Sequence, residues 1–399
     1  MIVQLLNKMR IFFWLVMILL GFACSDNAEL LQQANRVSQD IKEQMAPDGR
    51  EAIYKTNFYI DKNQTLVVSG ETSLPEAKLA LFSALEHRKI HLLDSMVLLP
   101  EKELGDLNWA LVNLSVVNLR SKPKHSAELV SQAIMGTPVR VLKKQNSWYL
   151  IQTPDNYIAW VDRAALAFKT KEEMKQWRNS ERVVFIPWFK LERDSIGKDV
   201  VTDLVAGSIL ELKRENSGFY WLTLPDGREI MVVKRDCELF NQWEQEKIED
   251  ASVLTKIAKQ FMGRPYLWGG TSSKGVDCSG FVKSVYFMHG IILARDASLQ
   301  FLHGDTISPE QGFRKLKEGD LVFFGRKATS DLPLKVTHVG MYMKDGEFIH
   351  SSGRVKINSF DSTADNYSDY RSISWLGGRR VLNRIGEAGV IRVAEHPWY

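Results

Sequence analysis

The sequence predicts an α+β domain in the C-terminal third of the chain, preceded by two small all-β barrels and a helical N-terminal segment. The barrels are indicated by short β-branched runs separated by turns, which occur twice in the middle of the chain. The N-terminal helix is indicated by Leu79, Phe82 and Leu85, which recur at helical spacing after Pro75. In the C-terminal third, helical patterns are followed by a run of strand patterns, as in α+β folds. A chain of 399 residues has room for two to four such domains.

The composition is that of a folded globular protein, with 45% hydrophobic and 25% charged residues. The formal net charge is +4, and no lysine- or arginine-rich block is interleaved with aromatic residues. These features disfavour nucleic acid as a partner.

The first residues form a secretory signal. Lys8 and Arg10 precede an uncharged apolar run that ends in small residues, and this run is short for a stable membrane span. Because Cys24 follows the small residue Ala23 directly, residues 1–24 resemble a bacterial lipoprotein signal. We therefore expect an exported periplasmic or cell-envelope protein whose lipidated Cys24 holds it at a membrane. A plain cleaved signal and an uncleaved anchor remain open. Residues 25–105 are expected to form a tether and a helical region.

The cysteines of this chain favour a reserved reactive thiol. There are three of them, Cys24, Cys237 and Cys278. If Cys24 carries lipid, only Cys237 and Cys278 remain to form a disulfide. That disulfide would disable a thiolate nucleophile. An exported chain that avoids disulfides is consistent with a free thiol kept for chemistry.

The middle of the chain contains an internal repeat. A shift of 71 residues places Gly136 on Gly207 and Tyr149 on Tyr220. The first copy looks like a bacterial SH3-like domain, whereas the second lacks its closing aromatic pattern and is interpreted as a structural spacer. The predicted boundaries are 106–170 for the first copy and 180–240 for the second.

Cys278 is placed where a turn-rich loop becomes a helix. Phe281, Val285 and Met288 follow it at helical spacing. The free N–H groups and the positive dipole end of a helix start stabilise a thiolate. We therefore expect Cys278 to react with thiol reagents well below the pH that an ordinary thiol needs. A buried core cysteine is the structural alternative.

Two histidines could supply the base that a thiolate nucleophile needs. His338 and His350 flank the turn signal 344–346 in a predicted hairpin. A three-residue loop would set His350 opposite Gly340, so that His338 is its diagonal neighbour on the same face. Both rings can then point at one site.

These residues resemble the NlpC-type (NlpC/p-sixty) cell-wall peptidases, which have a papain-like fold. The resemblance covers most of residues 246–382, the predicted peptidase domain. It implies that Cys278 is the nucleophile, His338 the general base and His350 the residue that orients it, with Tyr266 beside the nucleophile. It implies no metal and no organic cofactor. The motifs that carry it are Tyr266-Leu267-Trp268-Gly269-Gly270, Asp277-Cys278-Ser279-Gly280-Phe281, Gly319-Asp320-Leu321-Val322-Phe323-Phe324, His338-Val339-Gly340-Met341-Tyr342 and Phe348-Ile349-His350-Ser351.

The order of signal, paired SH3-like domains and peptidase resembles the YkfC-like γ-D-glutamyl-L-diamino-acid endopeptidases. In that subfamily the first SH3-like domain covers the cleft and restricts entry to peptides with a free N-terminal L-Ala. Carboxylates would fix the ammonium group, and a tyrosine would limit the length. A solvated charge at Glu128 and a helix cap at Asp277 are the structural alternatives. The matching substrate-binding positions are Glu128, Tyr157, Tyr266, Trp268, Asp277, Ser279, Asp296 and Ser298.

The resemblance implies a monomeric cysteine endopeptidase of peptidoglycan stem peptides. It would cut the bond between γ-D-glutamate and diaminopimelate or lysine, in turnover or recycling of the cell wall. One alternative is a wall-binding SH3-like adaptor whose peptidase domain is not catalytic. The other is a hydrolase of intact, cross-linked murein.

Overall fold

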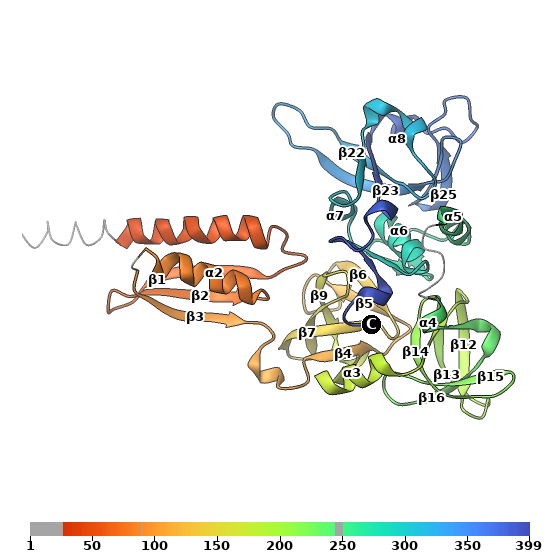
Figure 1. The fold of residues 1–399 in the computed structure, drawn as a ribbon, viewed down its shortest axis with the longest axis horizontal. Coiled ribbons are helices and arrows are strands. Elements are labelled where there is room, and N and C mark those ends of the chain that lie inside the picture. Colours follow the sequence, from red (N-terminus) through yellow and green to blue (C-terminus); the bar gives the residue numbers. More distant parts are fainter. Residues whose placement is uncertain (1–26, 89, 244–249) are drawn as a thin grey trace, which may run out of the picture. The chain divides into compact units, whose positions relative to one another are not determined.

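The structure is a computed structural model that describes residues 27–88, 90–243 and 250–399 (Figure 1). It divides into two units, Met1–Glu103 and Leu104–Tyr399. The predicted signal and Cys24 lie outside the described residues. Within the described part of the chain, no helix has the length and apolar character needed to cross a membrane.

The N-terminal unit is a mixed α/β unit. A helix over residues 27–45 precedes β1 (Tyr54–Ile60), β2 (Leu66–Thr72), α2 (Pro75–Glu86) and β3 (Leu92–Leu98). Strand β2 pairs with β1 in antiparallel and with β3 in parallel fashion, and α2 forms the crossover between β2 and β3.

The prediction of a helical region over residues 25–105 is therefore wrong for its three strands. The helical pattern identified α2 alone, because pairing of β2 with β3 across that helix leaves no local signal. The buried face of α2 also differs from the prediction. It consists of Ala77, Leu81 and Leu85, whereas Leu79 is 69% exposed.

The first barrel is a seven-stranded sheet in the order β10-β4-β7-β8-β9-β5-β6. Its core includes Leu119, Val139, Ile151 and Val161. Buried and more exposed residues alternate along the strands that carry Leu119 and Val161. The strands are β4 (Trp109–Val112), β5 (Val116–Arg120), β6 (Leu129–Ile134), β7 (Pro138–Gln145), β8 (Trp148–Gln152), β9 (Ile158–Asp162) and β10 (Leu166–Lys169).

The second barrel repeats the first. Its order, β13-β12-β16-β15-β14-β11-β17, is that of the first barrel read in reverse, strand for strand. Gly136 and Gly207, which the repeat aligns, have φ angles of +82° and +85°, a left-handed conformation that glycine adopts readily. This confirms the predicted repeat, and α3 (Lys171–Asn179) connects the two copies. The strands are β11 (Arg182–Phe185), β12 (Phe189–Asp194), β13 (Val200–Val205), β14 (Ile209–Glu215), β15 (Phe219–Thr223), β16 (Glu229–Val233) and β17 (Cys237–Leu239).

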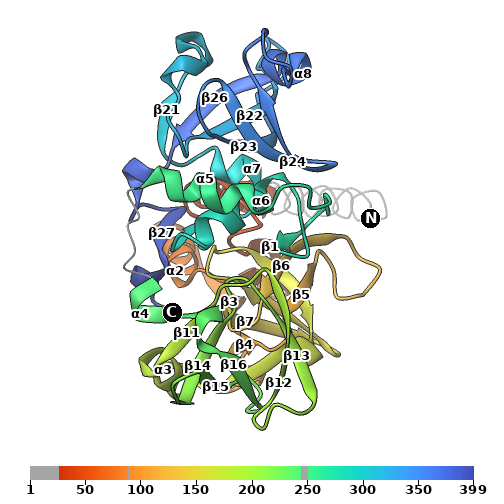
Figure 2. The same ribbon diagram turned by 90° about the vertical axis from the view of Figure 1, so that its right-hand side faces the viewer.

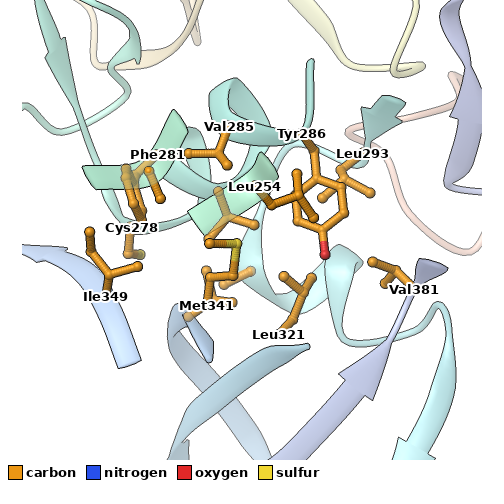
Figure 3. Close-up of a cluster of buried hydrophobic side chains, with 14 of the residues drawn as sticks. Leu254, Cys278, Phe281, Val285, Tyr286, Leu293, Leu321, Met341, Ile349 and Val381 are labelled. Atoms are coloured by element: carbon orange, nitrogen blue, oxygen red, sulfur yellow. The ribbon is translucent and has the colours of Figure 1, made fainter. Parts of the chain in front are cut away.

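The C-terminal domain packs helices on a six-stranded sheet of order β21-β26-β22-β23-β24-β25 (Figure 2). Helix α6 is buried through Phe281, Val285 and Tyr286, which pack against Leu321 and Met341 of the sheet (Figure 3). Its helices are α5 (Ala251–Lys259), α6 (Cys278–Phe287), α7 (Ala297–Gln300) and α8 (Asp369–Ile373), after a short α4 (Phe240–Trp243). Its strands are β18 (Thr271–Ser272), β19 (Gly275–Val276), β20 (Ile291–Leu293), β21 (Asp305–Ile307), β22 (Leu321–Arg326), β23 (Lys335–Tyr342), β24 (Glu347–Ser352), β25 (Arg354–Ser359), β26 (Trp375–Arg380) and β27 (Val390–Arg392).

The chain after Leu382 also belongs to this packing. Strand β27 pairs with β20 in antiparallel fashion, and Tyr399 lies 6.4 Å from Phe287 between ring centroids. The sequence pattern of this segment carries no signal for that pairing, because three residues are too few to show a period.

Candidate active site

Cys278 is the first residue of α6, as the sequence predicts. Asp277 is the N-cap, and its Oδ1 accepts a hydrogen bond of 2.6 Å from the Gly280 N–H. A side chain at position 280 would place its Cβ 2.0 Å from the Gly270 carbonyl oxygen. Glycine at 280 therefore allows the helix start to approach the preceding loop and fixes the position of the sulfur.

The protonation state of Cys278 differs from the prediction. The side chain is 8% exposed and lies among Met341, Ile349 and other apolar residues (Figure 3). Burial raises the pKa of the Cys278 thiol to about 11, although the N–H groups of Val339 and Ser279 act in the opposite direction. Desolvation outweighs the helix terminus, so the expected lowering of the thiol pKa is wrong for the free protein.

The two histidines meet in the predicted register. Met341 pairs with Ile349 and Tyr342 with Phe348, and Gly346 in the loop has a φ of +83°. The Nε2 atom of His338 lies 2.7 Å from Nδ1 of His350, and the ring planes are at 90°. Because the Val339 N–H bonds to the Cys278 sulfur, β23 brings this pair to the nucleophile.

A hydrogen-bonded chain fixes the tautomer of each ring. The Asn358 amide donates through Nδ2 to the Asn366 carbonyl (2.9 Å), so its Oδ1 accepts from Nε2 of His350 (2.9 Å). A neutral His350 then has a lone pair on Nδ1 and accepts from the Nε2–H of His338. The remaining lone pair of His338 is on Nδ1, the atom available to take a proton from a thiol.

Burial keeps both rings neutral. It lowers the pKa of His338 well below 6.5 and that of His350 to about 4, and the nearby Arg371 charge acts in the same direction. A neutral imidazole next to a neutral thiol can act as a general base during attack on a carbonyl carbon.

Tyr266 lies near Cys278 and Asp277. Its ring is half-buried, and burial together with the charges of Cys278 and Asp277 raises the pKa of its hydroxyl. The hydroxyl therefore stays protonated and can donate a hydrogen bond.

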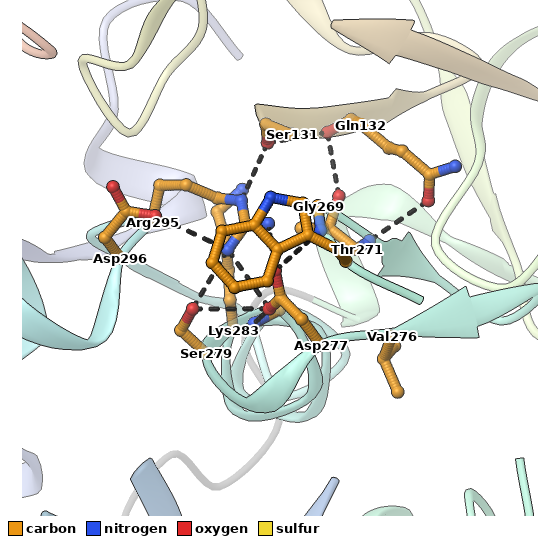
Figure 4. Close-up of polar contacts among 12 residues, drawn as sticks. Ser131, Gln132, Gly269, Thr271, Val276, Asp277, Ser279, Lys283, Arg295 and Asp296 are labelled. Carbon is orange, nitrogen blue, oxygen red and sulfur yellow. Dashed lines mark hydrogen bonds and ion pairs between the residues drawn. The ribbon is translucent and has the colours of Figure 1, made fainter. Parts of the chain in front are cut away.

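Asp277 belongs to a buried polar cluster with Arg295 (Figure 4). Its Oδ2 lies 2.6 Å from Nη2 of Arg295 and also accepts from the Gly269 N–H at 3.0 Å, while Oδ1 caps the helix. Ser279 bonds to the same guanidinium at 3.0 Å. Asp277 was predicted to bind substrate, but its carboxylate is already neutralised, which favours the helix-cap alternative.

The first barrel lies against this side of the site. Strand β6 accepts two hydrogen bonds through Gln132: its Oε1 accepts from the Thr271 N–H (3.1 Å), and its carbonyl accepts from the Thr271 hydroxyl (2.8 Å). Ser131 accepts from Nε of Arg295 at 3.0 Å (Figure 4). The predicted proximity of the first barrel to the nucleophile helix is thus confirmed.

The remaining predicted binding residues gather around the same edge. Nε1 of Trp268 donates to Oε1 of Glu128 at 2.9 Å, which joins an exposed barrel carboxylate to the loop before Cys278. Tyr157 is 5% exposed and lies close enough to Arg295 to affect its pKa. Asp296 is 3.8 Å from Nη1 of Arg295, and Ser298 is half-buried in α7.

Sequence reasoning missed Asn358, Arg295, Gln132 and Arg371. The sequence held one signal for Asn358. It follows His350 by an even number of residues across the hairpin of β24 and β25, so the two side chains lie on the same face of the sheet. The other three act through contacts between domains or from a separate helix, for which the sequence has no period.

The chain matches two known families in separate segments. Residues 263–375 match the NlpC/P60 family and residues 115–167 match the bacterial SH3 domain. It is 30% identical to a γ-D-glutamyl-L-lysine dipeptidyl-peptidase of Bacillus cereus over 233 residues, which is 56% of this chain and 67% of that relative. It is 26% identical to dipeptidyl-peptidase 6 of Lysinibacillus sphaericus, over 63% of this chain and 92% of that protein.

Solved structures show the same fold. The crystal structure of an NlpC/P60 family protein from Bacillus cereus aligns with a TM-score of 0.59 at 24% identity, covering 69% of this chain and 99% of that one. An NlpC/P60 endopeptidase from Photobacterium damselae subsp. piscicida aligns with a TM-score of 0.54 at 15% identity, covering 92% and 93%.

Proposed function

Because this chain belongs to the NlpC/P60 family of cysteine peptidases, we propose that it hydrolyses the amide between γ-D-glutamate and the diamino acid of peptidoglycan stem peptides. The relatives named γ-D-glutamyl-L-lysine dipeptidyl-peptidases support this bond as the target. The observation that carries the chemistry is the 2.7 Å contact between His338 and His350 next to Cys278. The same arrangement argues against the adaptor alternative, in which no working base would be needed.

The geometry supports a two-step reaction. Cys278 Sγ attacks the γ-carbonyl carbon while Nδ1 of His338 takes its proton, and backbone N–H groups at the start of α6 stabilise the oxyanion. His338 then gives the proton to the leaving amine as the C–N bond breaks. Water, deprotonated by His338, hydrolyses the thioester and restores the thiol. His350 accepts from Nε2–H throughout and stabilises the imidazolium.

The barrel side of the site supports recognition of a free N-terminal amine. Oε1 of Glu128 is held by Trp268, and the carboxylate remains exposed. A carboxylate in this position can pair with the ammonium group of L-Ala. Tyr157, Tyr266, Ser279, Asp296 and Ser298 line the surrounding edge in this proposal, and Asp277 acts by holding Arg295 and the helix start.

Peptidoglycan lies in the cell envelope, and membership of a family of cell-wall peptidases supports an exported protein. We further propose that Cys24 carries lipid and anchors the chain to a membrane, a proposal that rests on residues 1–24 alone. We also propose a monomer as the active form.

The test is product analysis by mass spectrometry. The wild-type protein should convert L-Ala-γ-D-Glu-diaminopimelate or the lysine peptide into L-Ala-γ-D-Glu and the diamino acid. Cys278→Ala should abolish this, whereas Cys237→Ala should not, since Cys237 lies in the second barrel. Hydrolysis at another bond, or undiminished hydrolysis by Cys278→Ala, would refute the proposal.

A further inference from the structure

Arg371 is a half-buried cation with no acidic partner among the residues that the structure describes. Among those residues, the one hydrogen bond of its guanidinium runs from Nη2 to the Ser352 hydroxyl at 3.3 Å. By contrast, Arg295 pairs with Asp277 and Arg380 with Asp320 at 2.8 Å. Partial burial of an unpaired guanidinium costs free energy, which an incoming anion would offset.

The guanidinium contacts Phe324, a neighbour of His338. Its carbon is 5.3 Å from the centroid of the Phe324 ring, and that ring is 5.8 Å from the ring of His338. Its charge acts on Cys278, His338 and His350. An anion bound here would therefore be part of a molecule whose scissile bond lies at Cys278.

The position of Arg371 indicates which part of the substrate it meets. The candidate amine site, Glu128 with Trp268, lies at the barrel side of Cys278. Both ribbon views place α6, β22 and β23 between β6 and α8, the helix that carries Arg371 (Figures 1 and 2). A peptide whose amino end lies under β6 thus directs its leaving group toward α8.

We propose that Arg371 binds the side-chain carboxylate of the diamino acid that leaves. This rests on the proposed function and adds a substrate preference to it. Diaminopimelate carries a side-chain carboxylate that lysine lacks, so peptides with diaminopimelate should be the better substrates. Arginine suits the role because its planar fork binds a carboxylate through two parallel hydrogen bonds.

The first measurement is kcat/KM for two peptides, L-Ala-γ-D-Glu followed by diaminopimelate or by lysine. Wild type should prefer the diaminopimelate peptide by about 10- to 100-fold, the range for a hydrogen bond to a charged group. Arg371→Gln should remove that preference, and Arg371→Lys should restore part of it. Arg379→Gln is the matched control, because Arg379 is also half-buried, stacks on Phe301 at 4.2 Å and lacks an acidic partner among the described residues.

The second measurement needs no turnover. Iodoacetate is an anion and iodoacetamide is its neutral analogue, so the ratio of their alkylation rates at Cys278 reports a nearby anion site. The rate for iodoacetate divided by the rate for iodoacetamide, measured by peptide mass spectrometry, should fall at least about fivefold in Arg371→Gln. It should stay unchanged in Arg379→Gln.

The two measurements separate this inference from the proposed function. If wild type cleaves neither peptide, the proposed function fails, while the alkylation ratio still tests the anion site. Equal cleavage of both peptides by wild type overturns the Arg371 inference and leaves the function standing. The same holds if the Arg371 dependence disappears when D-glutamate is replaced by D-isoglutamine, because the anion would then belong to the acyl side.

Discussion

At the residue scale, burial sets the resting state of the nucleophile. The pKa of Cys278 is raised to about 11 and that of His338 is lowered well below 6.5, so both are neutral across the physiological range. Transfer of the proton from sulfur to Nδ1 then occurs during attack, when substrate has displaced water and charge develops.

This state predicts the pH dependence of kcat/KM for the free enzyme. The catalytic form requires unprotonated His338. Because the pKa of His338 is lowered, the fall of kcat/KM on the acidic side of the profile shifts to lower pH. We expect kcat/KM to stay level from pH 8 to below pH 6.5 and to fall only at lower pH, as His338 gains a proton. Alkylation of Cys278 by iodoacetamide should keep rising toward pH 11. An acid limb at or above pH 6.5, or alkylation that saturates below pH 8, would indicate a thiolate–imidazolium pair instead.

Asn358 is predicted to be a positioning residue. Asn358→Ala frees Nε2 of His350, which allows the tautomer that donates from Nδ1 and clashes with the donor on His338. We expect kcat to fall about 10- to 100-fold, a part of the usual contribution of general-base catalysis, with KM nearly unchanged. Asn366→Ala is the control, since it keeps the backbone carbonyl that holds Asn358. Equal losses in both variants would show a merely structural effect.

At the scale of elements, the helix start of α6 depends on the Asp277–Arg295 pair. Asp277→Ala would remove the N-cap and leave Arg295 buried without its partner, at a cost of about 3–5 kcal/mol in unfolding free energy. Thr170→Ala, which removes the capping box of α3 without breaking an ion pair, should cost only about 1 kcal/mol. Denaturant titrations of both variants check this, and similar losses would contradict a special role for the pair.

The elements that local pattern determines are those that the sequence predicted. The parity of the loop between His338 and His350 is enough to place both rings on one face, and the helical spacing after Cys278 locates α6. Strand β3 and the chain after Leu382 were not predicted, because β3 pairs with β2 across α2 and β27 is very short. Strands β1 and β2 pair as neighbours along the chain, and sequence reasoning missed them. Asn358 and Arg371 were not predicted, because a single polar residue on a strand or a short helix produces no periodic sequence pattern.

At the scale of the molecule, specificity depends on how the first barrel docks. Polar contacts near the site join Gln132, Ser131 and Glu128 on the barrel to Thr271, Arg295 and Trp268. The barrel residue Leu111 also packs in one apolar cluster with Ile292 and Val393. The sequence could not locate them, since residues at a domain interface show no periodicity. The resemblance to a family supplied the expectation, and the individual hydrogen bonds came from the structure.

The docked barrel predicts a substrate of limited size. Strand β6 lies against the N-terminal end of α6 and limits the size of the substrate that can reach Cys278. Intact sacculi should therefore be cleaved far more slowly than soluble stem peptides. Release of diamino-acid-terminated fragments from purified sacculi, followed by mass spectrometry, checks this. Comparable rates on sacculi and on free peptide would favour the alternative of a hydrolase of intact murein.

The most direct test of the account is a competition between a free stem peptide and its N-acetylated form in one reaction, followed by mass spectrometry. A Cys278 site covered by the first barrel and Glu128 should consume the free peptide at least about tenfold faster, and Glu128→Gln should reduce that ratio. Equal consumption of the two peptides by the wild-type protein would contradict recognition of a free N-terminal amine at this site.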